Sequence, residues 1–405
     1  IHMYVPPAHL AKYTTGRKLY KQQLASSYTK HLGINTINTK TIKRKPYCLQ
    51  REGFRAYAAS LSRHNRKLIC TPRHARRASC PPPTDVVAGF DLDSSCQYAY
   101  DANNGKDKFI CKNIAEVTGE EVKELLKDFD IKVLVGCAPC QPFSKHRKDK
   151  KHREKHKDWG LLAQFGRLVR EVQPDYVSME NVPELEKESI FSGFLNTLKE
   201  SGYSVEYSVV KAEEYGVPQH RRRLILLASR NGSISLIDPT NDNAHAVTVR
   251  QAIGALPAVS AGGSCRGDSL QTASALSELN LKRIKASTPN GTWRDWPEDL
   301  RLDCHKKAAG QTYPAVYGRM AWDETSPTIT TQFYMYGTGR FGHPEQNRAL
   351  TLREGAVLQS FPQDYKFIRP GEKISKKAVA RHIGNAVPPK LGEAVGKSII
   401  AACVH

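Results

Sequence analysis

The stretch KVLVGCAPCQPFSKH, residues 132–146, decides the fold of this chain. A short apolar run ends at Gly136 and is followed by two cysteines, Cys137 and Cys140, and then by polar and basic residues. Such a run, bounded by a glycine and a loop, is typical of a fully buried strand. We therefore predict a parallel sheet in which this strand delivers the cysteine pair at its carboxyl end, where open α/β sheets bind their ligands.

Three further apolar runs, residues 85–90, 175–179 and 222–229, also predict strands. Polar side chains follow the first two of these runs, namely Asp91, Asp93, Glu180 and Asn181. Between the strands lie amphipathic segments, of which residues 161–172 have the spacing of a helix that Pro174 ends. The alternation predicts an α/β fold with a Rossmann-like, mostly parallel sheet.

Composition divides the chain into four parts. Residues 1–84 form an atypical basic segment, with 17 Lys and Arg against one acidic residue, and we expect it to be disordered or translated out of frame. Residues 85–238 are predicted to form a catalytic domain. Residues 239–330 are richer in Gly, Ser, Pro and Thr and predict a smaller, loop-rich lobe, and residues 331–405 return to the catalytic domain.

Charge and cysteine content narrow the class of protein. The net charge is +21, and residues 145–157 hold eight basic and two acidic side chains next to Cys140. A solvated loop is one reading of this run, and contact with a polyanion is the favoured one. The chain has neither an apolar run of membrane-spanning length nor the apolar centre of a secretory signal. We therefore expect a cytoplasmic protein that does not associate with a membrane. Ten cysteines without a repeating framework indicate reduced thiols.

The cysteine pair has several possible roles. A redox pair normally opens a helix, and a zinc site needs a second pair, which the sequence lacks. We therefore expect no metal, and we expect Cys137 to be an inert packing residue. Cys140 is the candidate nucleophile, because nearby positive charge favours a thiolate.

A carboxyl and two guanidinium groups join Cys140 at the predicted sheet edge. Glu180 follows the next strand, and Arg221 and Arg223 lie two residues apart on an extended segment, so they are expected to face the same way. Such a set suits a polar ring that must be attacked and protonated.

The residue sequences of these segments and their order along the chain resemble those of a known family. GCAPCQPFS, SMENVPEL, VPQHRRRLILLA, RALTLREGAVLQSFPQDY and RHIGNAVPPKLGEAVG resemble five motifs of the DNA (cytosine-5) methyltransferases, in the family's order. The resemblance implies the S-adenosylmethionine-dependent methyltransferase fold. It also implies transfer of a methyl group from S-adenosylmethionine to C5 of a flipped-out cytosine in double-stranded DNA.

The resemblance assigns roles to individual residues. Cys140 would attack C6 of the cytosine, Glu180 would hold N3 and the exocyclic amine, and Arg223, with Arg221 nearby, would bind the O2 side. The implied cofactor contacts are Asp91, Leu92, Asn113, Ile114, Pro139, Leu161, Asn385 and Val387. The expected DNA contacts are Gln141, Ser144, Lys145, His146, Arg147, Lys148 and Gln219. We expect a monomer that recognises DNA through the smaller lobe, with a cognate restriction endonuclease acting separately.

One family feature is missing from the sequence. The family opens with a strand and a Gly-rich turn about 20 residues before the position of Asp91, but residues 71–84 read TPRHARRASCPPPT and contain no glycine. The alternative hypothesis is therefore an inactive remnant that binds DNA without methylating it. An RNA-directed relative is less favoured, because the cysteine–phenylalanine–threonine signature of that branch is not found.

Overall fold

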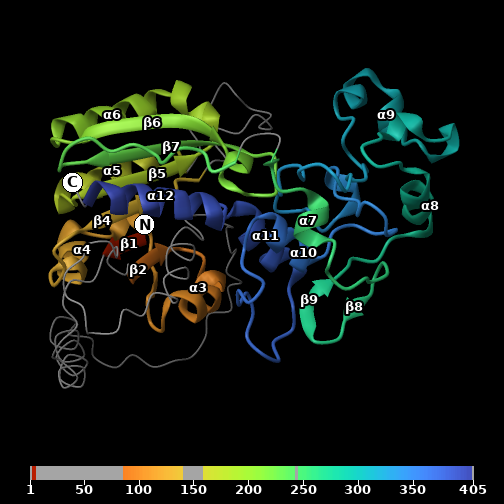
Figure 1. Ribbon diagram of the computed structural model, residues 1–405, viewed down its shortest axis with the longest axis horizontal. Helices are drawn as coiled ribbons and strands as arrows, with labels where there is room; N and C mark the ends of the chain where they lie inside the picture. The colour runs from red at the N-terminus through yellow and green to blue at the C-terminus, as the bar shows by residue number, and fades with distance from the viewer. Residues whose placement is uncertain (1, 6–84, 140–157, 242–244, 404–405) are drawn as a thin grey trace, which may run out of the picture.

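The computed structural model describes residues 2–5, 85–139, 158–241 and 245–403 of the 405-residue chain. A seven-stranded sheet with the order β3-β2-β1-β4-β5-β7-β6 forms the centre of the larger lobe (Figure 1). Its strands are β1 His2–Val5, β2 Asp85–Asp91, β3 Phe109–Cys111, β4 Val133–Gly136, β5 Tyr176–Asn181, β6 Ser204–Lys211 and β7 Arg222–Ser229.

The strand directions confirm the predicted α/β class. β2 pairs parallel with β3, and β4 pairs parallel with β5. β7 runs antiparallel to both β5 and β6, so β6 again shares the direction of β5. The four strands predicted from apolar runs correspond to β2, β4, β5 and β7. The edge strand β6 was not predicted because half of its residues are exposed, which leaves no continuous apolar run.

An interior position of the sheet is taken by β1, which the sequence did not predict. This strand lies between β2 and β4 and is antiparallel to both, with His2 opposite Gly89 and Val135. Its carboxyl end therefore lies at the edge where β2 and β4 begin, away from the edge where they end. Residues 6–84, for which disorder or a frame disruption was expected, lie outside the described residues.

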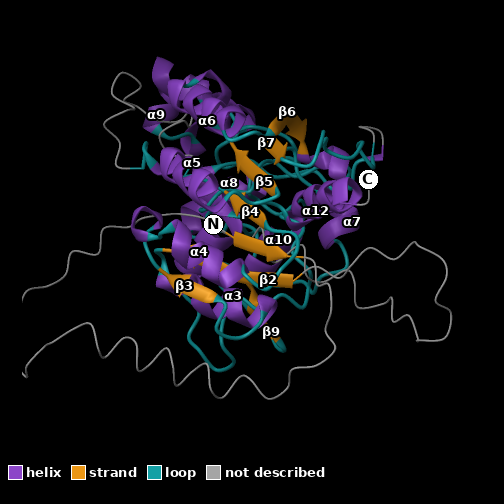
Figure 2. Ribbon diagram, turned by 90° about the vertical axis from the view of Figure 1, so that its left-hand side faces the viewer, coloured by secondary structure: helices purple, strands orange, loops and turns teal. Residues whose placement is uncertain are grey.

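Helices cover both faces of the sheet (Figures 1 and 2). α4 (Gly119–Leu126), α5 (Leu161–Val172) and α6 (Ser189–Glu200) share one apolar core with Phe90 and Leu134. On the other face, α3 (Gln97–Asn104) and α12 (Pro389–Cys403) pack against Val133 and Val135. The α5 helix confirms the predicted amphipathic segment. In the described part of the chain, no helix combines the length and the apolar character needed to cross a membrane.

A second lobe lies beside the sheet (Figure 1). It contains α7 (Val249–Ile253), the hairpin β8 (Ser264–Cys265) and β9 (Asp268–Thr272), α8 (Glu278–Ala286), α9 (Asp303–Lys306), α10 (Leu352–Leu358) and α11 (Lys376–Asn385). One apolar core joins α7, α10 and α11. The segments of 239–330 are therefore packed against elements from the end of the chain.

Buried polar contacts tie this lobe together. The Arg348 guanidinium donates hydrogen bonds of 2.8 and 2.7 Å to the two oxygens of Glu354, and both side chains are inaccessible to solvent. Arg319 is also buried and donates to the backbone carbonyls of Ile284, Ser287, His343 and Gln346 and to Asn347 Oδ1. Since α8 lies far in sequence from residues 343–347, Arg319 joins two distant segments.

Candidate active site

A carboxylate and a guanidinium meet at the carboxyl end of β5. Glu180 is buried, and its Oε1 lies 2.8 Å from Arg223 Nε. Glu180 pairs opposite Ile225, so Arg223 is its diagonal neighbour on β7 and lies within reach across the antiparallel ladder. The sequence predicted this meeting, because both side chains were placed at the same edge of the sheet.

Asn181 connects the end of β5 to the turn that follows β4. This side chain is buried, its amide nitrogen donates to the carbonyl of Ala138 at 3.0 Å, and its oxygen accepts from the amide of Val182 at 2.8 Å. The turn before Cys140 is therefore held by the residue next to Glu180. Asn181 was predicted at this sheet edge, but its sequence context indicated no role for it.

The expectation for Cys137 requires correction. Cys137 packs against the cores on both faces of the sheet, as predicted, but it is only partly buried. Its thiol lies 2.6 Å from Glu180 Oε2. Cys137 therefore touches the predicted catalytic carboxyl and is more than a packing residue.

The predicted nucleophile and the basic loop lie outside the described residues. This applies to Cys140, Gln141, Ser144, Lys145, His146, Arg147 and Lys148. The preceding residue, Pro139, is buried at the end of the β4 turn. The roles of these seven side chains stay predictions.

Arg221 and Arg223 do not share a hydrogen-bonding direction, contrary to the prediction. The buried Arg221 guanidinium donates to the carbonyls of Ile329, Gly384 and Ala386, at 3.3 to 3.5 Å. Arg223 instead reaches Glu180. Regular strand structure begins at Arg222, so the alternation of side chains does not extend back to Arg221.

Gln219 lies in the protein interior, which argues against the predicted DNA contact. Its side chain has no exposed area, and its oxygen accepts from the amide of Ile329 at 2.9 Å. Its nitrogen donates to the carbonyl of Leu358 at 3.2 Å. Gln219 and Arg221 thus connect the segment before β7 to the second lobe.

The predicted cofactor residues gather at the carboxyl end of β2 and nearby. Asp91 is buried and accepts a hydrogen bond of 2.9 Å from the amide of Asp93, whereas the next residue, Leu92, is 42% exposed. Asn113 caps the short helix Ile114–Glu116 by accepting from the amide of Ala115. The Ile114 side chain is buried in the core, so only its backbone remains for a cofactor contact.

The other predicted cofactor residues come from three places. Asn385 ends α11 and Val387 lies buried just before α12, whereas Leu161 begins α5 and Pro139 lies in the turn after β4. Arg381 of α11 donates to Asp93 at 2.8 Å, which ties this helix to the turn after β2. Arg381 was overlooked, although it opens the quoted segment RHIGNAVPPKLGEAVG, because sequence spacing gives no sign of its partner.

Asp93, Cys96 and His382 place potential metal-binding atoms within 4.8 Å of one another. Asp93 is already engaged by Arg381, and His382 Nε2 lies 2.9 Å from Ser95 Oγ. These contacts give the group a structural role in joining α11 to the turn after β2.

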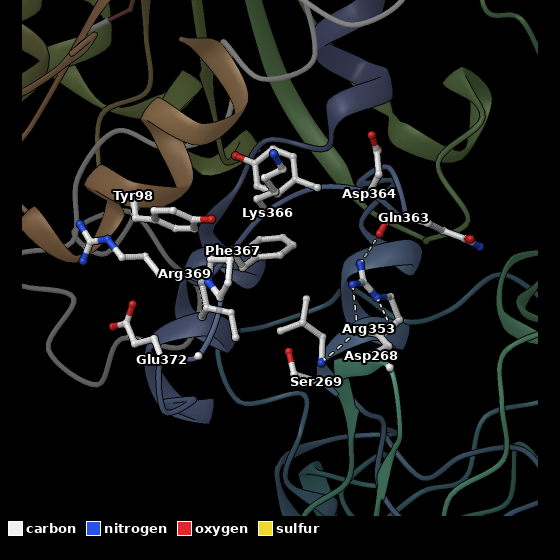
Figure 3. A pocket seen from close by; sticks show the side chains of 16 residues that line it. Tyr98, Asp268, Ser269, Arg353, Gln363, Asp364, Lys366, Phe367, Arg369 and Glu372 are labelled. Atoms are coloured by element: carbon white, nitrogen blue, oxygen red, sulfur yellow. Dashed lines mark hydrogen bonds and ion pairs between the residues drawn. The ribbon is translucent and has the colours of Figure 1, made fainter. Parts of the chain in front are cut away.

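A cavity of about 540 Å³ lies between α3, β9 and residues 363–372 (Figure 3). Arg353 lies in the wall of this cavity and donates hydrogen bonds of 2.6 and 3.0 Å to the two carboxylate oxygens of Asp268. Burial opposes ionisation of Asp268, but the hydrogen bonds and charge of Arg353 outweigh it and lower the pKa of this carboxyl. The ion pair between Arg353 and Asp268 connects the β8–β9 hairpin to α10.

Solved structures share this architecture. A protein described as a DNA modification methyltransferase encoded within an Escherichia coli prophage is similar over 79% of this chain and 93% of its own, with a TM-score of 0.59 and 20% identity. A variant of Dnmt2 from Spodoptera frugiperda is similar over 78% of this chain and 92% of its own, with a TM-score of 0.52 and 18% identity. The chain therefore shares the fold of these two structures.

Sequence comparison defines the family. Residues 74–401 match the profile of the C-5 cytosine-specific DNA methylases. Type II methylase M.HgiDII of Herpetosiphon aurantiacus is 50% identical over 78% of this chain and 88% of its own length. Type II methyltransferase M1.BsuMI of Bacillus subtilis is 33% identical over 74% of this chain and 70% of its own length. The chain belongs to the C-5 cytosine-specific DNA methylase family, and its enzyme class is DNA (cytosine-5) methyltransferase.

Proposed function

We propose that this protein transfers the methyl group of S-adenosylmethionine to C5 of a flipped-out cytosine in a specific double-stranded DNA sequence, through a covalent bond between Cys140 and C6. The observation that carries the proposal is the contact between Glu180 and Arg223 at the end of β5. A carboxyl and a guanidinium fixed to each other can hold one edge of a pyrimidine ring at two points.

The side chains divide the chemistry between them. Cys140 attacks C6 as a thiolate while Glu180 supplies a proton at N3, so that the ring does not accumulate negative charge. Arg223 stabilises charge that develops at O2. When C5 has received the methyl group, loss of the C5 proton and departure of the Cys140 sulfur restore the aromatic ring and the enzyme.

The residues at the end of β2 support binding of S-adenosylmethionine, which supplies an electrophilic methyl group when bound. Asp91, a buried carboxyl at the end of β2, is proposed to accept a hydrogen bond from a ribose hydroxyl, and the exposed Leu92 is proposed to offer an apolar surface to the adenine ring. Asn113, Pro139, Leu161, Asn385 and Val387 are proposed to complete this site. The Asn113 oxygen has a second lone pair beyond its bond to Ala115, so it can still accept from an amino group.

The names of the relatives suggest the biological setting. We propose that the chain is the modification enzyme of a Type II restriction–modification system, acting as a monomer beside a separate endonuclease. Residues 239–330 are proposed to read the DNA sequence in the major groove, with residues 331–405 returning to the catalytic domain. The basic residues that follow Cys140 are proposed to contact phosphates, which makes binding depend on salt.

A second candidate function, DNA binding without catalysis, is favoured by one observation. β1 runs antiparallel to β2 and β4, so its carboxyl end points away from the edge at which β2 places Asp91. A Gly-rich turn placed directly after such a strand would begin at the edge opposite Asp91, and residues 71–84 contain no glycine.

Transfer of labelled methyl from S-adenosylmethionine to unmethylated genomic DNA separates the two candidates. Genomic DNA contains almost every short recognition sequence, so the target need not be known. The proposed function predicts label in 5-methylcytosine that disappears in Cys140→Ala. Retained DNA binding without transfer by the unaltered chain would establish the inactive alternative.

A further inference from the structure

We propose that Cys137 is a positioning residue for Glu180, and that its thiol fixes the carboxyl in the orientation that the reaction needs. This inference rests on the proposed function. It starts from the approach of Cys137 Sγ to Glu180 Oε2 at 2.6 Å, between the turn after β4 and the end of β5.

The two oxygens of Glu180 have different partners. Arg223 Nε lies 2.8 Å from Oε1, and the Cys137 thiol lies against Oε2. Carboxyl oxygens accept hydrogen bonds, and a thiol can donate one. The Cys137 thiol therefore donates a hydrogen bond to Oε2, and it also lies 3.5 Å from the backbone carbonyl oxygen of Glu180.

Two partners from different strands restrain the carboxyl more than one does. Glu180 has three rotatable side-chain bonds, and Arg223 alone leaves the carboxyl plane free to turn about the bonded oxygen. The thiol approaches from the end of β4, while Arg223 approaches from β7. Together they fix the plane of the carboxyl, so that it presents the same edge to N3 and the exocyclic amine of the base.

The position of Cys137 also links two parts of the proposed reaction. It lies in the same short turn as Ala138, whose carbonyl is held by Asn181. The thiol thus adds a second connection between the turn that leads to Cys140 and the strand that carries Glu180. Displacement of this turn would misplace both reacting groups.

The first test measures the contact without catalysis. In a Cys140→Ala background, iodoacetamide labels Cys137, and the labelling rate is read by peptide mass spectrometry at pH 8. Glu180→Gln removes the opposing charge, so labelling of Cys137 should become about tenfold faster. The partly exposed Cys265, whose thiol contacts only Arg266 in the part of the chain described here, serves as the internal control and should not change. Equal rates for Cys137 would overturn the proposal.

The second test measures the consequence for methyl transfer to DNA. Cys137→Ala should lower kcat about tenfold with KM for DNA nearly unchanged, and Cys137→Ser, which keeps a donor, should restore most of it. An unchanged kcat in Cys137→Ala, or an equal loss in Cys137→Ser, would overturn the positioning role. Absence of transfer by the unaltered chain, with the labelling difference intact, would instead refute the proposed function.

Discussion

At the scale of single residues, the pair Glu180 and Arg223 carries the proposed chemistry, whereas the neighbouring Arg222 is exposed on the same strand. Arg223→Ala should lower the single-turnover rate of methyl transfer by about a hundredfold or more, because it removes a cation aimed at developing charge. Arg222→Ala is the matched control and should change the rate less than about threefold. Similar losses in both variants would show that the effect is a general weakening of DNA binding.

Asn181 allows a prediction about stability. Its amide donates to the Ala138 carbonyl, and substitution by alanine leaves that buried carbonyl without its donor. Asn181→Ala should therefore lower the free energy of unfolding by about 1–3 kcal/mol in urea titration. The exposed Asn231 is the control, and Asn231→Ala should cost less than about 0.5 kcal/mol. A neutral Asn181→Ala would mean that the turn does not depend on this bond.

At the scale of elements, the packing of α11 depends on a glycine. A Cβ at Gly384 would lie 2.4 Å from the carbonyl carbon and oxygen of Thr330, which are backbone atoms and cannot turn away. Gly384→Ala should lower the free energy of unfolding by about 1–3 kcal/mol. Gly193→Ala in α6 is the opposite case, because nothing lies within 4 Å of the added atom and alanine favours helix. That variant should be as stable as the unaltered chain or more stable, and equal destabilisation by both would contradict this account.

The elements also show how far sequence reasoning reaches. β4 and β5 were predicted because all their residues are buried, which favours apolar side chains over most of each strand. β3 has only three residues, and β1 forms through pairing with strands more than 80 positions away, so local pattern could not reveal either. Within the site, the meeting of Glu180 and Arg223 followed from the shared sheet edge. The burial of Gln219 and the direction of Arg221 depend on where the last segments pack, which spacing does not encode.

At the scale of the whole molecule, a buried histidine makes stability depend on pH. Burial lowers the pKa of His343 to about 4, and its Nδ1 accepts the amides of Glu345 and Gln346. Below about pH 6.5 the unfolded chain binds a proton at His343, whereas the folded chain does not. The contribution of His343 to the free energy of unfolding is therefore full above about pH 6.5 and is lost as the pH falls toward 4.

Unfolding in urea at pH 7 and pH 5 tests this dependence. Between pH 7 and pH 5, the free energy of unfolding of the unaltered chain should fall by about 2 kcal/mol more than that of His343→Gln. Arg353 and Arg348 lower the pKa values of Asp268 and Glu354 against the effect of burial. The stabilisation from these two carboxylates should be lost below their unfolded pKa values, about pH 4 for Asp268 and about 4.5 for Glu354. Equal losses in the unaltered chain and in His343→Gln would show that His343 does not remain neutral in the folded protein.

The measurement that tests the central claim most directly uses DNA whose cytosines carry fluorine at C5. Loss of the C5 proton normally releases Cys140 from C6, and fluorine cannot leave in this way, so the bonded complex should accumulate. The account predicts, in the presence of S-adenosylmethionine, a protein–DNA complex that survives denaturation, with the DNA attached at Cys140. Absence of such a complex, or its undiminished formation by Cys140→Ala, would contradict the proposed mechanism.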